Sequence, residues 1–265
     1  MIDRLIGAFF RFYVILLFGF IFAPFVTLVA FAFNTSRFPY LPWQGFTLDW
    51  FRSLNDAAII AAFGNSVLVA TLTAVIATPL GCTAAYCLNR WDFRGKSAYL
   101  AFLVSPPCIP LIIVAVTLLI YLRQLGVSKT LAGVVISHVV LAAPFALGVM
   151  RLRLAELDSD LERAAWNLGA NEFTAIRTIV LPQVWPAVIA AFLLSMSVSW
   201  DEFIVSWFVS GLDITLPVYL WNRFQGQISA QINAIGSVAF FVSIMLVVIV
   251  ELILFRPGKT HDEGE

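Results

Sequence analysis

Two adjacent acidic residues, Asp201 and Glu202, interrupt an apolar stretch that runs from Val184 to Ser210. A carboxylate near the centre of a membrane costs roughly 2.5–3.5 kcal/mol on insertion scales, so it persists where it meets water, a partner or a solute. Neighbours on a helix point about 100° apart, so both carboxylates cannot face one narrow path, and we favour Asp201. The alternative is a structural pair, satisfied inside the chain or across a subunit interface.

Aromatic side chains cluster in sequence around these acids. A Trp or Tyr ring attracts an ammonium group within about 6 Å of its centroid, so rings and acids together could form a path for an organic cation. The other interpretation is the belt of aromatic residues that membrane proteins place at the water interface. The candidate pathway residues are Trp200, Asp201, Glu202, Trp207, Tyr219, Trp221 and Phe224.

The sequence offers little for catalysis. It has only two histidines, His138 and His261, and three cysteines without a C-x-x-C pair, so we expect no catalytic residue and no metal site. An intramembrane enzyme would need a set such as H-E-x-x-H, and His138 has no acidic residue at helical spacing. There is also no G-x-x-x-x-G-K-[ST] loop, so we expect no bound nucleotide or other cofactor in this chain.

Composition places the chain in the membrane. Of its 265 residues 61% are hydrophobic and 12% are charged, against about a quarter charged in soluble domains, and the mean hydropathy is +0.92. The net charge is zero, which argues against nucleic acid as a partner and leaves lipid as the expected surroundings.

Six apolar runs are long enough to cross a hydrocarbon core of about 30 Å, which predicts an all-α, polytopic membrane protein forming one domain. Three prolines, Pro106, Pro107 and Pro110, predict a broken or kinked third span. Most of the 16 Lys and Arg fall in segments on the side of the two termini, which the positive-inside rule makes cytoplasmic. The predicted spans are residues 12–33, 61–88, 97–122, 131–150, 184–210 and 232–255.

A polar stretch, residues 159–182, separates two of these runs. Ser159 and Glu162 have the spacing of a capping box that starts a helix, Gly169 can end it in the left-handed conformation, and Asn171 can cap a second short helix reaching Pro182. We call this segment the elbow. Its apolar stripe, expected to face the rest of the chain, consists of Leu161, Ala164, Ala165 and Leu168.

The elbow closely resembles the E-A-A-x3-G-x9-I-x-L-P motif of ABC importer permeases, through Ala164, Ala165, Gly169, Ile179 and the pair Leu181-Pro182. The resemblance implies a coupling helix that sits in a cleft of an ATPase subunit. Arg163 stands where the motif has Glu, with a glutamate one residue earlier. The residues implied in coupling are Glu162, Arg163, Ala164, Ala165, Leu168 and Gly169.

The resemblance extends over nearly the whole chain and is to the spermidine/putrescine branch of these permeases. It rests on segments such as Ala32-Phe33-Asn34, Asn65-Ser66, Trp200-Asp201-Glu202 and Thr215-Leu216-Pro217. It implies the type I importer fold in a bacterial inner membrane, with half of the pathway for a polyamine formed by this subunit. The implied partners are a second permease, two ATPase subunits that bind ATP and Mg, and a periplasmic binding protein.

Two alternatives remain open. A permease of the same family could carry another amine, an opine or an amino-acid derivative. A secondary transporter would also have apolar spans and an intramembrane acid, but would need its own coupling-ion site and often a second, inverted half, and no internal repeat is visible in the sequence.

Overall fold

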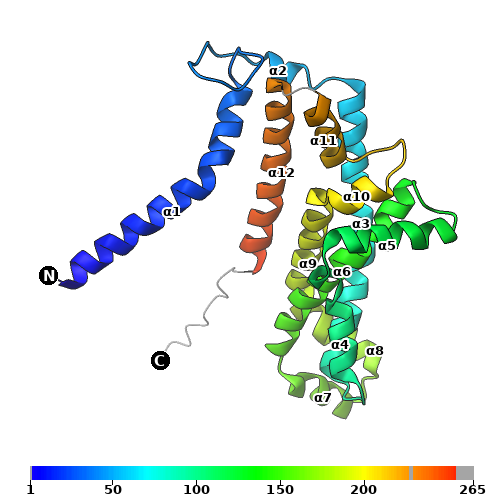
Figure 1. The fold of residues 1–265 in the computed structure, drawn as a ribbon. Helices are drawn as coiled ribbons and strands as arrows, with labels where there is room; N and C mark the ends of the chain where they lie inside the picture. Colours follow the sequence, from blue (N-terminus) through cyan, green and yellow to red (C-terminus); the bar gives the residue numbers. More distant parts are fainter. Residues whose placement is uncertain (1, 227–228, 255–265) are drawn as a thin grey trace. The chain divides into compact units, whose positions relative to one another are not determined.

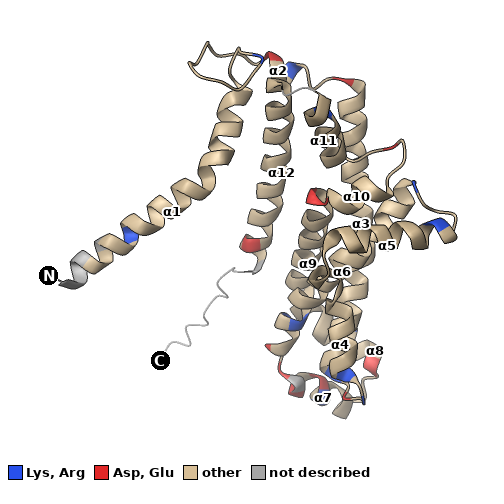
Figure 2. Ribbon diagram, in the orientation of Figure 1, with Lys and Arg blue, Asp and Glu red and all other residues tan. Residues whose placement is uncertain are grey.

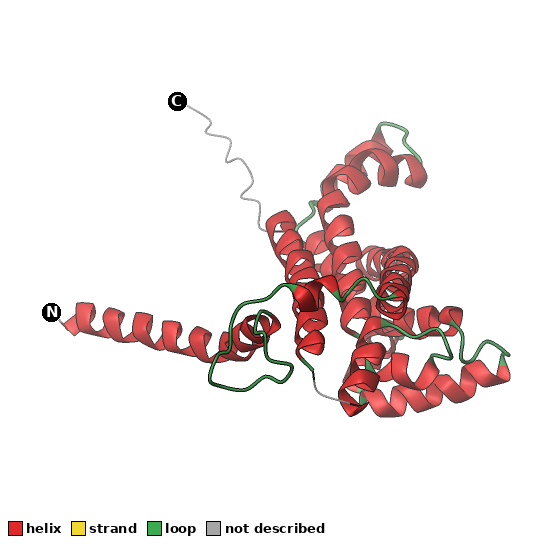
Figure 3. Cartoon of the chain, turned by 90° about the horizontal axis from the view of Figure 1, so that it is seen from above, coloured by secondary structure: helices red, strands yellow, loops and turns green. Residues whose placement is uncertain are grey.

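The computed structural model describes residues 2–226 and 229–254, and every regular element in these ranges is a helix (Figure 3). Contacts divide the chain into two compact units, which are described separately. Unit 1 contains the described residues up to Ile60 and those from Tyr219 to Val242. Unit 2 contains Ala61–Val218 and the described residues from Ser243 onward.

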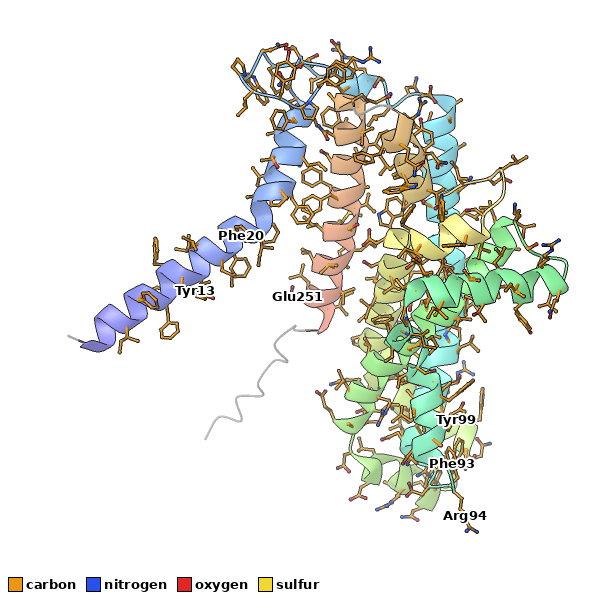
Figure 4. The ribbon with its side chains drawn as sticks, viewed as in Figure 1. Tyr13, Phe20, Phe93, Arg94, Tyr99 and Glu251 are labelled. Carbon is orange, nitrogen blue, oxygen red and sulfur yellow. The ribbon has the colours of Figure 1, made fainter. Side chains whose placement is uncertain are left out.

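Unit 1 is dominated by two long apolar helices, α1 (Ile2–Ala32) and the first part of α12 (Ala230–Leu254). They pack through stacked rings of Phe25 and Phe240, whose centroids are 4.5 Å apart. Tyr13 and Phe20 project outward from α1 and are exposed (Figure 4), as expected of side chains that meet lipid.

The long loop after α1 folds around one buried amide. The side-chain oxygen of Asn34 accepts hydrogen bonds from the backbone N–H groups of Ser36 and Gln44, and the indole N–H of Trp50 donates to the Asn34 carbonyl at 2.8 Å. Trp50 belongs to the short α2 (Asp49–Arg52). The irregular outer loop predicted from its Pro, Gly and Trp content is therefore held by specific polar contacts.

Unit 2 is a helical bundle in which α6 packs against α9 and α5 packs against α10. Gly81 lets α3 approach α6 closely, because a Cβ at this position would lie 2.6 Å from the Cβ of Ala146. The helices are α3 (Ala57–Arg90), α4 (Lys96–Val104), α5 (Leu111–Gln124), α6 (Leu131–Ala155), α7 (Ser159–Asn167), α8 (Glu172–Ala175), α9 (Leu181–Asp201) and α10 (Ile204–Val209), with a 3-10 turn η1 (Pro106–Cys108) and a π turn η2 (Ile176–Val180) (Figure 1). A further helix, α11 (Leu216–Gly226), crosses the boundary between the units.

Five helical segments among the described residues are long and apolar enough to span a membrane. The third predicted run is broken at its prolines into α4, η1 and the shorter α5, as the sequence indicated. The fifth run differs from its prediction, because α9 ends at Asp201 and a separate short helix follows. The spanning segments are Phe9–Ala32, Ala57–Arg90, Leu131–Ala155, Glu172–Asp201 and Ala230–Ile253.

Candidate functional site

The elbow begins one residue earlier than the sequence predicted. Asp158 is the N-cap of α7, and its carboxylate accepts a hydrogen bond from the backbone N–H of Asp160 at 2.9 Å. The predicted capping box of Ser159 with Glu162 is therefore wrong. Asp158 can supply the cap alone, which leaves the Glu162 side chain available for a contact outside its own helix.

Glu162 ties α7 to the end of α3. Its carboxylate accepts a hydrogen bond from the Tyr86 hydroxyl at 3.3 Å and lies 3.5 Å from Nε of Arg90. The Arg90 guanidinium in turn lies over the ring of Trp166, 4.2 Å from its centroid. We call these four residues, Tyr86, Arg90, Glu162 and Trp166, the elbow clamp. It joins two turns of α7 to one end of a long helix of the bundle.

The clamp turns α7 away from the orientation predicted from its apolar stripe. Ala165 is buried as expected, but Leu161 and Ala164 are exposed and Leu168 is 89% exposed. The inward face is instead Glu162, Ala165 and Trp166, which follow the helical spacing i, i+3 and i+4. The ion pair with Arg90 sets this face. The predicted orientation of the stripe is therefore wrong.

The outward face of α7 combines apolar and charged side chains. Arg163 is exposed and pairs with Asp160 one turn earlier, at 3.0 Å. Leu161, Ala164 and Leu168 share this solvent side. Of the six residues implied in coupling, Arg163, Ala164, Leu168 and Gly169 are thus exposed, whereas Glu162 and Ala165 are held inside the chain.

The end of α7 follows the sequence prediction. Gly169 has φ +88°, the Ala170 N–H donates to the Ala165 carbonyl at 3.0 Å, and the Gly169 N–H donates to Trp166 at 2.9 Å. This is the Schellman arrangement that glycine favours. Asn171 then caps α8 by accepting from the Thr174 N–H at 2.8 Å, which confirms its predicted role.

The second part of the elbow does not stop at Pro182 as expected. From Glu172 the chain continues as one helical segment through η2 and α9 to Asp201. In η2 the Leu181 N–H donates to the carbonyl of Ile176, five residues earlier. Pro182 lacks an N–H, and a proline is tolerated at the start of the following α helix.

The acidic pair lies at a break in this helix and not in the middle of a span. Glu202 has an extended conformation, with ψ 112°, and its carboxylate accepts a hydrogen bond from the Val205 N–H at 2.8 Å, which caps α10. Asp201 accepts from the hydroxyl of Ser243 at 2.8 Å. Figure 2 shows acidic colouring where α9 gives way to α10. The two carboxylates therefore have different surroundings.

The predicted aromatic residues belong to both units of the chain and are described unit by unit. Trp200 is buried and packs edge-on against Phe63, with centroids 5.4 Å apart, so its ring is used in packing. Trp207 is about half exposed, next to Phe208. The other three predicted rings, Tyr219, Trp221 and Phe224, belong to unit 1.

In α11 one of these rings, Tyr219, already has a cation of the same chain next to it. Arg223 lies 5.3 Å from the ring centroid of Tyr219, which is buried, and donates to its hydroxyl at 2.8 Å. Trp221 stacks on Phe224, with centroids 6.1 Å apart, and both are exposed. The rings with exposed surface are therefore Trp207, Trp221 and Phe224.

Sequence reasoning missed one residue that contacts the helices before and after the acidic pair. His138 of α6 is buried, and its two ring nitrogens lie 2.8 Å from the Ser199 hydroxyl and 2.9 Å from the Ser206 hydroxyl. We call these three residues the break bridge. A search for an acidic neighbour at helical spacing could not find partners 61 and 68 positions away. The only signal was the presence of serines in an apolar run.

The helical bundle, with its third run broken at prolines and an elbow between two spans, has the features that the sequence predicted for a membrane permease. Residues 77–256 match the family described as the binding-protein-dependent transport system inner membrane component, and this chain belongs to that family. It is a transmembrane subunit of an ABC importer, a transport component and not a catalytic one.

Curated relatives include a spermidine/putrescine transport system permease protein PotC from Shigella flexneri, 32% identical over 94% of each chain. The PotC protein of Haemophilus influenzae is 33% identical over 91% of this chain and 94% of its own length. A putrescine transport system permease protein PotI from Escherichia coli K12 is 32% identical, over 84% of this chain and 83% of its own.

Solved structures support the fold. A bacterial ABC transporter involved in the import of the acidic polysaccharide alginate aligns with a TM-score of 0.71 at 20% identity, covering 95% of this chain and 94% of its own. The MetNI methionine ABC transporter aligns with a TM-score of 0.56 at 21% identity, covering 77% and 93%. The bundle therefore has the type I importer fold predicted from the sequence.

Proposed function

We propose that this chain forms half of the translocation pathway of an ATP-driven importer for a polyamine such as spermidine or putrescine. The observation that carries the proposal is the acidic pair at the α9–α10 break. Among the ion pairs of the described residues none includes Asp201 or Glu202, and the hydrogen bonds to their carboxylates come from the neutral donors Ser243 and Val205. Two carboxylates without a basic partner suit a solute that brings its own positive charges.

The surrounding spans favour the same class of solute. The apolar part of α9 contains no Lys or Arg, which a pathway for an anionic solute would need near its centre. A path for a flexible diamine or triamine must attract ammonium groups and also release them, which one or two acids achieve better than a tight cage. Relatives named for spermidine and putrescine point in the same direction.

The energy for transport comes from partner subunits in this proposal. The sequence lacks a nucleotide-binding loop, so two ATPase subunits would bind ATP and Mg and would dock on the elbow. The exposed outward face of α7, with Arg163, Ala164 and Leu168 next to Gly169, supports that role. A second permease would complete the pathway and a periplasmic binding protein would deliver the solute, as in the neighbouring structure that contains a periplasmic protein.

We place both termini and the elbow in the cytoplasm. The basic residues of the sequence favour this side, although Arg256 and Lys259, which contribute to the count, lie outside the described residues. Arg94, one of these basic residues, lies exposed at the turn between α3 and α4, where Phe93 packs edge-on against Tyr99 (Figure 4). Aromatic rings beside basic residues are typical of the membrane–water interface.

The test is isosteric removal of the two negative charges. Asp201→Asn and Glu202→Gln keep the size of each side chain, and the Gln oxygen can still accept from Val205. We expect uptake of radiolabelled putrescine and spermidine by the reconstituted complex to fall at least about tenfold in the double variant, since each lost charge contact contributes about 1 kcal/mol or more.

Asp213→Asn is the matched control, because Asp213 is an exposed acid in the loop after α10. It should transport at the parental rate, and co-purification with the ATPase should show that all variants assemble. Parental rates in both single variants and in the double variant, or a parental complex that carries neither amine, would refute the polyamine pathway and leave the permease assignment alone.

A further inference from the structure

The acidic pair depends on the geometry of a break in the helix. Glu202 is extended, so the α-helical hydrogen-bond ladder is interrupted between α9 and α10. Asp201 ends α9, and the Glu202 carboxylate accepts from an amide of α10, so the angle between these two helices sets where the two carboxylates lie relative to each other. Because α10 has six residues, which is too short to be stable by itself, contacts with the bundle must hold it.

His138 supplies such a contact on both sides of the break. Its Nδ1 lies 2.8 Å from Oγ of Ser199, two residues before Asp201, and its Nε2 lies 2.9 Å from Oγ of Ser206, four residues after Glu202. The imidazole comes from a third helix, α6, and is 1% exposed. One buried ring therefore contacts the helix that ends at the acids and the helix that follows them.

The chemistry of the bridge favours a single geometry. A neutral imidazole has one donor and one acceptor nitrogen, and a serine hydroxyl can act as either, so both nitrogens are satisfied in each tautomer. Removing the ring would leave two buried hydroxyl groups without this partner, which is more costly than the loss of one exposed bond. Simple packing of α6 on α9 would not require a group that reaches both serines.

We propose that His138 is a positioning residue of the permease, which holds α9 and α10 at a fixed angle and thereby orients Asp201 and Glu202 toward the transported solute. The fixed angle follows from the bridge geometry alone. The effect on solute rests on the proposed polyamine function. The experiments therefore include one readout that needs no solute and one that does.

The solute-free readout is hydrogen exchange of the α10 amides in the complete complex in lipid nanodiscs. In His138→Leu we expect exchange across residues 204–209 to become about tenfold faster or more, since local opening follows the loss of contacts. The double variant Ser199→Ala with Ser206→Ala should show a similar increase. Adding the two serine changes to His138→Leu should change exchange less than about twofold further, as coupled residues are not additive.

Ser195→Ala is the matched control. Ser195 lies on the same helix, is fully buried, and its hydroxyl has no hydrogen-bond partner among the described residues. The substitution removes the same atom as Ser199→Ala without touching the bridge. Exchange in α10 should remain at the parental rate.

The solute readout is the ratio of spermidine to putrescine uptake, in which the fraction of folded complex cancels. Two carboxylates held in a fixed orientation discriminate between solutes with three and two ammonium groups. In His138→Leu we therefore expect this ratio to change about threefold or more, and to stay at the parental value in Ser195→Ala.

The outcomes separate the two claims. Parental exchange in His138→Leu, or additive effects of the histidine and serine changes, would overturn the bridge. Faster exchange with an unchanged uptake ratio would overturn the positioning role. A parental complex that transports neither amine, together with faster and non-additive exchange, would overturn the polyamine function and support the bridge.

Discussion

The elbow clamp and the break bridge each hold a short helix on a long helix, but with different side-chain chemistry. Each fastens a short helix, α7 or α10, to a long helix of unit 2 through side chains that are distant in sequence. The clamp uses a charged pair, Arg90 with Glu162, whose side chains are 26% and 10% exposed. The bridge uses a neutral imidazole between hydroxyl groups at a site that is almost completely buried.

The difference reflects the cost of removing charge from water. An ion pair at the partly exposed end of the bundle keeps some of its hydration. For two charges in the apolar interior, the free energy of lost hydration can exceed the free energy gained from their attraction. Neutral hydrogen bonds carry a much smaller desolvation cost and still fix direction. The contrast indicates that charge holds the elbow where solvent reaches it, and that neutral groups hold the break within the bundle.

The largest effect is expected from removing the cation of the clamp. Arg90→Met leaves Glu162 buried without its partner and removes the contact with Trp166. Loss of one partner of a buried pair costs about 3–5 kcal/mol, and the partial exposure here reduces this to about 1–3 kcal/mol. We expect faster proteolysis of the elbow and at least tenfold lower uptake in the reconstituted complex.

The control for this variant is Arg94→Met, which removes an exposed cation from the adjacent turn. The double variant Arg90→Met with Glu162→Gln should recover part of the loss, because it leaves no unpaired charge. If protease cleaves the elbow at the same rate in Arg90→Met as in Arg94→Met, the clamp does not hold α7.

An intermediate effect is expected at Gly169, where the backbone and not a side chain is under test. Nothing lies within 4 Å of a Cβ added there, so the cost of Gly169→Val comes from φ +88° alone and is about 1–3 kcal/mol. ATP hydrolysis should become uncoupled from uptake while the spans still insert. Both rates can be measured in proteoliposomes.

Gly169→Asn is the informative companion, because asparagine tolerates the left-handed region better than a β-branched residue. Its uptake per ATP hydrolysed should lie near the parental value. A valine variant with parental coupling would show that the turn geometry is unimportant for the elbow.

The smallest effect is expected from an exposed ion pair near the clamp. Lys96 lies 2.7 Å from Asp92 and, through its hydrogen bond and charge, holds the pKa of that carboxyl below its usual value. A carboxyl whose pKa is lowered by folding stabilises the fold at pH values above its unfolded-state pKa. This stabilisation is lost as the pH falls through its lower folded-state pKa. Its full contribution is therefore present at pH 7.

Asp92 is fully exposed, so Asp92→Asn should leave the Tm of the purified complex at pH 7 unchanged within error. Thermal unfolding of the parent and the variant at pH 7 measures this. A clear fall in Tm would show that exposure does not separate this pair from the clamp.

Much of the fold could be predicted from local patterns. Apolar run lengths indicated the spans, the prolines near Pro106 indicated the broken third span, and Gly169 with Asn171 indicated the turn between α7 and α8. These features depend on residues close in sequence. The rotation of α7 could not be predicted in this way, because Arg90 decides it from 72 positions before Glu162.

The candidate site was predictable in composition but not in geometry. Asp201 and Glu202 are conspicuous in an apolar run, yet the break between them and α10 depends on a carboxylate capping Val205, a choice that periodicity does not reveal. Trp200 looked available and is buried against Phe63. His138 looked isolated because its partners are on other helices.

The π turn η2 also has a mechanical consequence. It lets Glu172–Asp201 form one helical segment of 30 residues, roughly 45 Å long at 1.5 Å per residue. One end of this rod starts just after the turn at Gly169, and the other ends at the acidic pair. A movement of the elbow therefore reaches the carboxylates through one continuous helical segment with no loop between its ends, and η2 and Pro186 are the places where this segment can bend.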